Sequence, residues 1–413
     1  MRQRVELGPG IPFIPEILRE ESFFLFRRVA DRDRAVLCIG SVAVSDTPGF
    51  DGTGKAPDWW YGHVTYDHKE QLHGLRSLHA AEAALPSSEW HVPRWVVEWR
   101  AGQAVLYVRP DEDLRAVREL QERIAQPVRG RSSRMPEVWT SRTSRQQYLD
   151  QAATFMQHIQ RGDIYEVNYC IERQAHWPGL DPFAAFARLL ERSAAPFAAF
   201  HRRGAQFTLC ASPERFLSFQ DERCWGEPMK GTRPRGRTPE EDLRLQAELA
   251  ADPKERSENI MALDVMRNDL SQVALPRSVK VEELCAVRSY PRVHQLVSTV
   301  TMQRRPDIGP FEVVNAAFPM ASMTGAPKHR AMQLIDALED QRRGLYSGTL
   351  GFFAPDGTGD LNVVIRALRY DTTTGLARLS TGSALTAQCD PLKEWEECAV
   401  KARSVIEALA DDR

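Results

Sequence analysis

The sequence lacks the features of several large classes of protein. Its seven cysteines are scattered and odd in number, and no two form a C-x-x-C pair, which argues against a disulfide framework and a zinc site. The 54 Lys and Arg residues nearly balance the 56 Asp and Glu residues, so the basic field that nucleic-acid binding needs is missing. No window approaches the roughly 20 apolar residues of a membrane span, and the N-terminus has no signal-peptide pattern. We therefore expect a soluble cytoplasmic protein that binds neither nucleic acid nor membrane and acts on a small molecule.

The apolar pattern that is present predicts two regions. In residues 1–145, apolar runs predict a hairpin over 23–44, a strand over 59–66, a second hairpin over 90–108 and a helix over 111–125. Residues 127–136 lose this pattern, so we place a boundary near residue 145. A helix over 144–160 opens the second region, 146–413. Its expected strands lie at 165–173, 197–200, 206–211, 215–220, 350–354, 362–370 and 377–381. Without regular βαβ alternation or a G-x-G-x-x-G turn, this pattern favours an antiparallel α+β fold over a doubly wound one.

Two acidic segments have the same sequence pattern. Asp252-Pro253 and Asp390-Pro391 each predict a helix start, because Asp caps a helix and Pro is tolerated in its first turn. Glu255 and Glu258 then share one helix face, as do Glu394 and Glu397, with Lys401 one turn beyond. If the two faces converge, they can hold Mg²⁺, which prefers oxygen ligands. Solvated acids at helix starts, where Glu255 takes the capping-box position, are the alternative interpretation.

A basic segment, Lys-Gly-Thr-Arg-Pro-Arg at residues 230–235, predicts an extended or turned loop that presents Lys230 and two guanidinium groups to an anion. A solvated basic turn is the alternative.

Glu214, beside an expected strand, can be a general acid kept protonated by burial, or can form an edge-strand ion pair with Arg215. His294 lies in an apolar context that is more typical of a core histidine. The small-residue loop at 322–327 leads into a helix N-terminus and can cradle an anion.

Nine stretches together resemble the chorismate-utilising enzymes, which comprise component I of anthranilate and aminodeoxychorismate synthases and the isochorismate and salicylate synthases. The matching stretches are GDIYEVNYC (162–170), SPERF (212–216), PMKGTRPRG (228–236), KERSENIMALDVMRND (254–269), VHQLVS (293–298), SMTGAPKHRAM (322–332), RGLYSGTLGF (343–352), LNVVIRA (361–367) and DPLKEWEECAVKAR (390–403). The resemblance implies two large, mostly antiparallel sheets packed face to face with helices outside. Residues 1–145 match loosely and are expected to add strands to the same fold, while 146–413 form the chorismate-binding catalytic region.

The resemblance also implies roles for matching positions. Glu258 and Glu397 would be Mg²⁺ ligands, with Glu255 and Glu394 behind them or acting through water. Glu214 would protonate the departing C4 hydroxyl of chorismate. The residues expected to hold the ring carboxylate of the substrate or to line its pocket are Tyr346, Arg366, the backbone around Gly382, Lys401, Thr324 and His294.

Lys230 distinguishes the branches of this family. Anthranilate synthases usually carry a small residue at its position, whereas aminodeoxychorismate synthases carry lysine, which is proposed to attack C2 of chorismate before ammonia attacks C4. This resemblance implies a transaminase-type reaction that leads to 4-aminobenzoate and folate. A nucleophilic lysine must be neutral, and we expect burial, Mg²⁺ and Arg233 or Arg235 to lower its pKa. No cysteine lies in a G-x-C-x-G turn, so we expect ammonia from a separate glutamine amidotransferase subunit.

Some positions depart from the family pattern. Glu166 stands where amide-transferring relatives usually have glutamine, so its role is open, and Ala321 and Ala384 replace common glycines. The absence of an LLES-type segment argues against tryptophan feedback. The absence of lysine at position 166 argues against isochorismate or salicylate synthesis. Anthranilate synthase component I remains the main alternative, and a homologue that binds chorismate or a partner without turnover is another.

Overall fold

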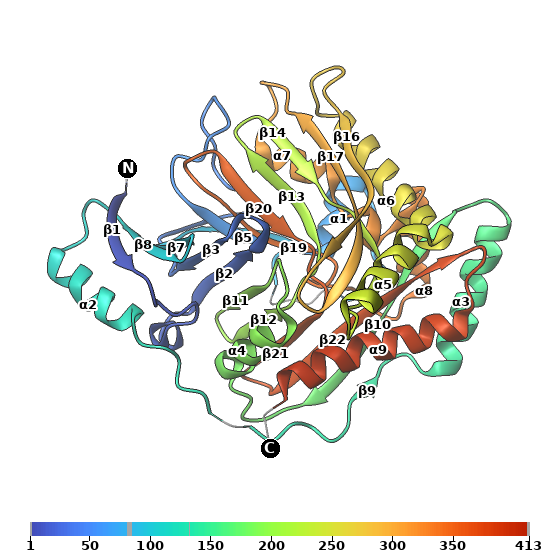
Figure 1. Ribbon diagram of the computed structural model, residues 1–413, viewed down its shortest axis with the longest axis horizontal. Helices are drawn as coiled ribbons and strands as arrows, with labels where there is room; N and C mark the ends of the chain where they lie inside the picture. Colours follow the sequence, from blue (N-terminus) through green and yellow to red (C-terminus); the bar gives the residue numbers. More distant parts are fainter. Residues whose placement is uncertain (1, 81–84, 132, 411–413) are drawn as a thin grey trace.

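The computed structural model describes residues 2–80, 85–131 and 133–410, and two large sheets dominate it (Figure 1). The first sheet contains, in spatial order, β1 (Gln3–Gly8), β8 (Gln103–Val108), β7 (Trp95–Arg100), β3 (Arg34–Ile39), β2 (Phe23–Val29), β11 (Ala199–Arg203), β12 (Gln206–Cys210), β21 (Ala367–Asp371), β22 (Leu376–Thr386), β10 (Glu166–His176) and β18 (Gly325–Ala326), with β9 (Thr140–Ser141) beside β10. The second contains β15 (Met229–Pro234), β17 (Val293–Gln303), β14 (Arg223–Gly226), β13 (Arg215–Gln220), β20 (Thr358–Asn362), β19 (Thr349–Phe353), β5 (Trp60–Val64), β6 (Ser88–Val92) and β4 (Ala43–Ser45), with β16 (Lys280–Ser289) beside β17.

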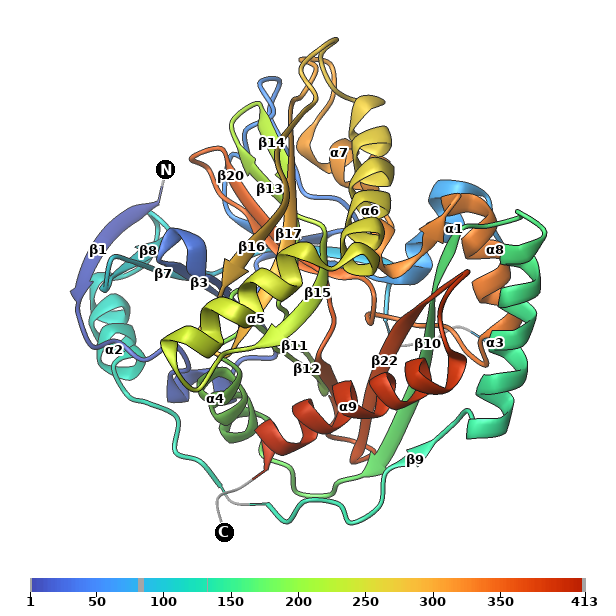
Figure 2. The same ribbon diagram turned by 45° about the vertical axis from the view of Figure 1, so that its right-hand side comes forward.

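The helices lie outside the sheets, as Figure 2 shows for α5 and α6 over β15 and β17 and for α9 beside β22. The α-helices described are α1 (Lys69–His73), α2 (Leu114–Ile124), α3 (Arg145–Gln160), α4 (Pro182–Ser193), α5 (Pro239–Ala251), α6 (Pro253–Ser271), α7 (Pro310–Ala317), α8 (Lys328–Leu338) and α9 (Pro391–Leu409). The short 3-10 turns are η1 (Glu16–Arg19), η2 (Ala30–Arg32), η3 (Tyr66–His68) and η4 (Ala321–Met323). The predicted α+β fold with two face-to-face antiparallel sheets is confirmed.

The space between the sheets is filled by apolar side chains from both. Leu25, Cys38 and Ala199 of the first sheet pack with Tyr61 and Phe352 of the second. Burying these side chains removes apolar surface from water and holds the sheets together. Other apolar clusters lie under the outer helices, including one that joins α4 and α9 to the first sheet.

A buried ion-pair network also joins the sheets. The guanidinium of Arg27, on β2, donates to Asp360 Oδ1 on β20 at 2.5 Å. Asp360 Oδ2 in turn accepts from Arg215 Nε at 2.9 Å, and Arg215 also pairs with Glu227 and Asp31. The alternative interpretation of an ion pair between Glu214 and Arg215 is therefore wrong, because Arg215 is engaged by these three other carboxylates.

The strands of residues 1–145 are interleaved with those of the rest of the chain. β2 pairs with β11, and β5 pairs with β19, so the N-terminal region contributes to both sheets. The expected boundary near residue 145 falls just before α3, whose Ser144 cap accepts from Gln147 N at 3.2 Å. The division into two regions stays a prediction.

Two local expectations are wrong. The segment predicted as a loop, with a solvated basic turn as the alternative, is strand β15, which pairs with β17 at one end of the second sheet. Its register shifts between Lys230 and Thr232, where Gly231 adopts φ +77, a left-handed conformation that glycine allows. The single strand expected over 362–370 is divided between β20 and β21, because Arg366 turns the chain with φ +53.

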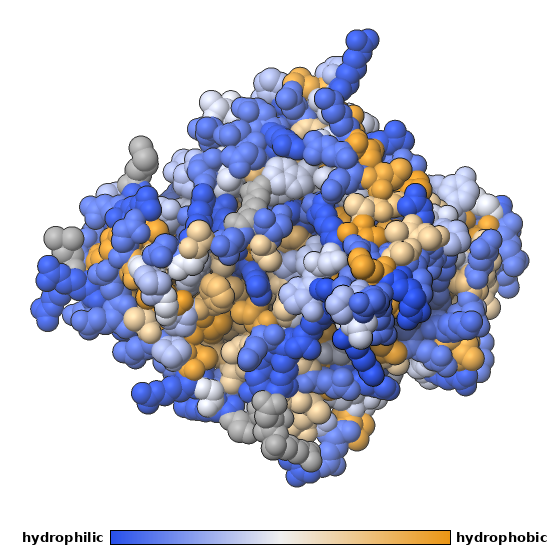
Figure 3. Space-filling view, viewed as in Figure 1, coloured by the Kyte–Doolittle hydropathy of each residue, from blue (hydrophilic) through white to orange (hydrophobic). Residues whose placement is uncertain are grey.

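On the face shown in Figure 3, polar side chains predominate and apolar ones lie in separate groups. Across residues 2–80, 85–131 and 133–410, the helices are too short or too polar to cross a lipid bilayer.

Candidate active site

The N-terminal turns of α6 and α9 carry the four predicted metal-binding carboxylates and come together in the fold. Asp252 accepts from the backbone N–H groups of Lys254 and Glu255, which confirms the predicted cap of α6. Glu258 and Glu394 are buried, at 6% and 4% exposure. Lys254 Nζ lies 3.8 Å from Glu258 Oε1 and 3.4 Å from Glu394 Oε1. One ammonium group thus contacts a carboxylate from each helix, so the two acidic faces converge.

The other two acids also have basic neighbours. Lys401 Nζ lies 2.7 Å from Glu397 Oε1, one turn away on α9. Burial acts to raise the pKa of Glu397, but the ammonium groups of Lys401 and Lys254 hold it below its usual value. Glu255 lies 3.8 Å from Arg233, and burial raises its pKa. Lysine and arginine side chains therefore offset much of the negative charge of this cluster.

Glu258 carries the strongest sign of an incompletely compensated charge. Burial raises its pKa to about 7, although Lys230 acts to lower it. Its Oε1 is buried and has no hydrogen-bond partner among the residues that the structure describes. Carboxylate oxygens in this state fit a hard cation such as Mg²⁺, which would stabilise their charged form. Within the described ranges, however, no three His, Cys, Asp or Glu side chains are grouped closely enough to hold a metal ion as they stand.

Lys230 reaches from β15 to the carboxylates of two other elements. Its Nζ lies 2.5 Å from Glu166 Oε1, on β10 of the first sheet, and 3.8 Å from Glu258 Oε2. Burial acts to lower the pKa of Lys230, but Glu166 and Glu258 together raise it above its usual value. Glu166, whose role the sequence leaves open, is the closest carboxylate to this amine.

The expected effect of the neighbouring arginines on Lys230 is wrong. Arg233 donates to Asp252 at 2.8 Å, and Arg235 forms a two-bond contact with Asp242. Their charge is directed at these acids. In the described structure, the carboxylates around Lys230 outweigh burial and favour its charged form.

Glu214 is buried beside the same lysine. Burial raises its pKa to about 7, while the hydroxyl of Ser322 and the charge of Lys230 act to lower it. Ser322 Oγ donates to Glu214 Oε1 at 2.7 Å. This carboxyl can therefore hold a proton near neutral pH, which a general acid requires.

The carboxylate-binding candidates lie around β22 and the turn before β21. Lys401 Nζ donates to the carbonyl oxygen of Gly382 at 2.8 Å. A Cβ on Gly382 would lie 2.3 Å from Asn168 Oδ1, so a larger residue there would force the Asn168 side chain to move. Arg366 donates to Ser404 Oγ at 3.0 Å, and burial lowers its pKa. Tyr346 is buried and shares the apolar cluster of Phe216 and Val363.

The two residues predicted to line the pocket, Thr324 and His294, both bond to other residues inside the protein. Thr324 is fully buried, and its hydroxyl donates to the carbonyl of Met320. This hydrogen bond spans the short helix η4 and stabilises it. His294 bonds through both ring nitrogens to Ser289 and to Asp242 of α5, as expected for a satisfied core histidine and not for a residue that faces substrate.

Gln295, the residue after His294, was not predicted as a site residue. Because strand side chains alternate, Gln295 faces away from α5. It is buried, and its Oε1 has no hydrogen-bond partner in the described part of the chain. The alternation within VHQLVS was the available signal, but it does not tell which face of the strand points to the site.

The sequence of the chain matches the model of the chorismate binding enzyme family over residues 32–407. The chain belongs to this family. It is 45% identical over 270 residues to an aminodeoxychorismate synthase of Streptomyces griseus, covering 65% of this chain and 37% of that protein. It is 38% identical over 271 residues to aminodeoxychorismate synthase component 1 of Escherichia coli K12, covering 66% of this chain and 59% of that protein. The first curated relatives are much longer than the match, which spans 30%, 37% and 35% of their lengths.

Two solved structures share the fold of this chain. Anthranilate synthase component I from Streptococcus pneumoniae TIGR4 superposes with a TM-score of 0.76 at 20% identity, covering 98% of this chain and 92% of that one. The menaquinone-specific isochorismate synthase MenF of E. coli superposes with a TM-score of 0.80 at 16% identity, covering 100% of this chain and 95% of that one. These matches establish the two-sheet architecture of this chorismate-binding family member.

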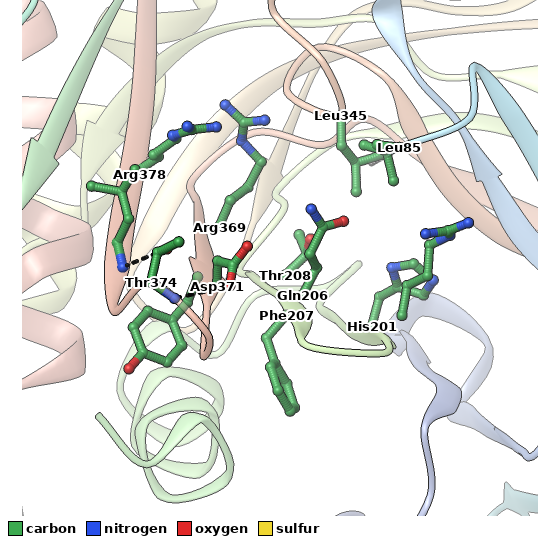
Figure 4. Close-up of a pocket in the computed structure, with 13 residues that line it drawn as sticks. Leu85, His201, Gln206, Phe207, Thr208, Leu345, Arg369, Asp371, Thr374 and Arg378 are labelled. Carbon is green, nitrogen blue, oxygen red and sulfur yellow. Dashed lines mark hydrogen bonds between the residues drawn. The ribbon is translucent and has the colours of Figure 1, made fainter. Parts of the chain in front are cut away.

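A separate cavity of about 130 Å³ is lined by residues of β11, β12, β21 and β22 of the first sheet (Figure 4). Strand register places His201, Thr208, Arg369 and Arg378 in one row across β11, β12, β21 and β22. None of the predicted site residues is among the residues that line it. Arg369 donates to Glu172 at 2.7 Å, so its charge is already matched by a carboxylate. The clustered acids, Lys230 and Glu214 make the other location the candidate active site.

Proposed function

We propose that the protein is an aminodeoxychorismate synthase component I, which replaces the C4 hydroxyl of chorismate with ammonia to give 4-amino-4-deoxychorismate. The observation that carries this proposal is Lys230, whose buried amine lies between Glu166 and Glu258 at the centre of the candidate site. Curated relatives with this name at 38% and 45% identity support it. The product would serve 4-aminobenzoate and folate synthesis.

In the proposed reaction, Lys230 first gives its extra proton to Glu166, the carboxylate in contact with its Nζ. The neutral amine forms a bond to C2 of chorismate, both ring double bonds shift by one position, and the bond from C4 to its hydroxyl oxygen breaks. Glu214 donates the proton that lets this oxygen leave as water. Ammonia then attacks C4 and becomes its ammonium group, both double bonds shift back, and the bond from C2 to Lys230 breaks with its electron pair going to the amine. Lys230 takes its proton back from Glu166, and Glu214 regains a proton from solvent. Arg366, Tyr346 and the backbone of Gly382 would hold the ring carboxylate during both steps.

Mg²⁺ would be held by Glu258 and Glu397, with Glu255 and Glu394 supporting them or acting through water. When bound, Mg²⁺ supplies positive charge that orients an anionic substrate carboxylate. The carboxylates of α6 and α9 keep the site acidic enough to attract a divalent cation, while Lys401 fixes the neighbouring backbone at Gly382.

Ammonia would come from a separate glutamine amidotransferase subunit. The E. coli relative is named component 1, which supports a two-component system for this chain as well. Free ammonium salt should replace the subunit in vitro.

Anthranilate synthase component I is the second candidate, favoured by a 35% identical relative of that name from Haloferax volcanii over 295 residues. One assay separates the two. The protein is incubated with chorismate, Mg²⁺ and ammonium salt, with and without 4-amino-4-deoxychorismate lyase. We expect 4-aminobenzoate only when the lyase is present. Fluorescent anthranilate without lyase would instead establish the second candidate, and unchanged chorismate would support a binding protein without turnover.

The role of Lys230 is tested by Lys230→Ala. We expect kcat to fall by at least about 100-fold with KM little changed, because the amine acts in the chemical step and not in substrate binding. Lys393→Ala, at an exposed lysine on α9, is the matched control and should keep full activity. An unchanged kcat in Lys230→Ala would make this lysine a bystander.

A further inference from the structure

Lys254 occupies an unusual place in the carboxylate cluster. It is the second residue of α6, and its ammonium contacts Glu258 on the same helix and Glu394 on α9. Its side chain is 50% exposed, whereas those of the two carboxylates are 8% and 6% exposed. The positive charge therefore enters the cluster from solvent on a flexible stem, while both acids are fixed inside.

The surroundings of the two acids show which of their oxygens can still take a ligand. Glu394 Oε2 accepts from the hydroxyl of Ser383, so only its Oε1 is directed to Lys254. Glu258 Oε1, at 3.8 Å from Lys254, has no hydrogen-bond partner in the described ranges. Lys254 thus places positive charge near Glu258 Oε1 and Glu394 Oε1 but makes no hydrogen bond to Glu258. A divalent cation that binds both oxygens directly can displace its ammonium.

We propose that Lys254 is a built-in competitor of the divalent cation: its ammonium neutralises Glu258 and Glu394 in the metal-free protein and must withdraw before a metal ion can bridge the two helices. This inference rests on the proposed function, because it takes Glu258 as a metal ligand. Only molecules in which the competing ammonium is withdrawn can bind the metal ion. The apparent metal affinity is therefore the intrinsic affinity multiplied by the fraction of such molecules. For a half-exposed lysine, we expect the apparent Mg²⁺ affinity to change about fivefold. This factor corresponds to the upper end, about 1 kcal/mol, of what a solvent-exposed ion pair contributes.

The test measures Mg²⁺ binding directly, without substrate or turnover. The full-length protein is freed of metal with a chelator and titrated with MgCl₂ by calorimetry at low ionic strength. Four proteins are compared: wild type, Lys254→Met, Lys254→Arg and Lys393→Met. Lys254→Met keeps the length of the stem and removes the charge, and Lys254→Arg keeps the charge. Lys393→Met removes an exposed charge next to Glu394 in sequence, so it measures the general Coulomb effect of one fewer cation nearby.

We expect Lys254→Met to bind Mg²⁺ about fivefold more tightly than Lys393→Met, and Lys254→Arg to resemble wild type or bind more weakly. Equal affinities of Lys254→Met and Lys393→Met would overturn the inference and leave the proposed metal site intact. Weaker binding by Lys254→Met would also overturn it. Absence of Mg²⁺ binding in all four proteins would overturn both the inference and the metal part of the proposed function. Thermal unfolding of each variant checks its fold, and Lys254→Gln replaces Lys254→Met if the latter does not fold.

Discussion

Replacing Glu214 with glutamine should make the protein more stable at alkaline pH while abolishing its activity. Glutamine has nearly the same shape, and its amide oxygen can still accept the hydrogen bond from Ser322 that Glu214 accepts at 2.7 Å. What it removes is the cost of holding a negative charge in a buried position. That cost is the reason why the pKa of Glu214 rises from its usual 4.5 to about 7.

The sign and size of the effect follow from proton binding. Because the folded pKa is the higher one, the folded protein binds more protons than the unfolded chain between about pH 4.5 and pH 7. The free energy of unfolding of the wild type therefore falls as pH rises through this window, by about 3 kcal/mol in total. Glu214→Gln lacks this dependence. Its advantage over the wild type should grow by about 2 kcal/mol between pH 5 and pH 8.

The assay is denaturant unfolding of both proteins at pH 5, 6.5 and 8, analysed as a difference at each pH. The difference matters because Glu258, with a pKa raised to about 7, and Asp269, with a pKa raised to about 6, titrate in the same window and cancel between the two proteins. Glu396→Gln, at an exposed position on α9, is the control and should show no pH-dependent difference. A constant offset between wild type and Glu214→Gln would refute the claim that Glu214 is held protonated by burial.

Two further substitutions test the framework around the site. In the wild type, Lys328 Nζ lies 2.6 Å from Asp269 Oδ2. Lys328→Met should lower the free energy of unfolding at pH 7 by about 3 kcal/mol, because it leaves Asp269 as a buried carboxylate without its counter-ion. A loss below about 1 kcal/mol in denaturant unfolding would contradict this. Gly382→Ala should strongly reduce kcat/KM for chorismate, because its Cβ would lie 2.3 Å from Asn168 Oδ1 and would displace the part of β22 expected to bind carboxylate. Gly52→Ala, which meets nothing within 4 Å, is its control, and equal activity of the two variants would count against the proposed role of this part of β22.

Features with local causes could be predicted from the sequence. The starts of α6 and α9 follow from Asp-Pro pairs whose carboxylates accept backbone N–H groups, as observed at Asp252 and Asp390. The same holds for α3, which begins after a capping Ser144. The residue pattern favoured an antiparallel α+β class, but the two packed sheets came from the family resemblance, since alternation along single strands does not tell which strands pair.

Features that depend on distant contacts could not be predicted. Lys254 and Glu394 are 140 positions apart, and their contact exists only because α6 and α9 pack on strands of different sheets. The strand that carries Lys230 looks like a turn in sequence, because an edge strand tolerates the charges, glycine and proline that an inner strand excludes. The left-handed turn at Arg366 has no sequence signal, because a non-glycine residue with positive φ is held there by its surroundings.

The lysines of the site also have a consequence for the stability of the metal-free protein. Folding brings buried Glu258 and Glu394 together, and two like charges in a buried place repel unless a cation lies between them. If Lys254 provides that cation, then Lys254→Met should unfold at a lower temperature than the wild type without metal. A ligand that binds only the folded state stabilises it by an amount that grows with the logarithm of its concentration divided by its Kd. Because the variant is expected to bind Mg²⁺ more tightly, saturating Mg²⁺ should raise its unfolding temperature by more than that of the wild type. Competition for the same carboxylates therefore requires that the loss of stability caused by the substitution shrinks when Mg²⁺ is saturating. A variant destabilised equally with and without Mg²⁺ would show instead that Lys254 only supports the fold.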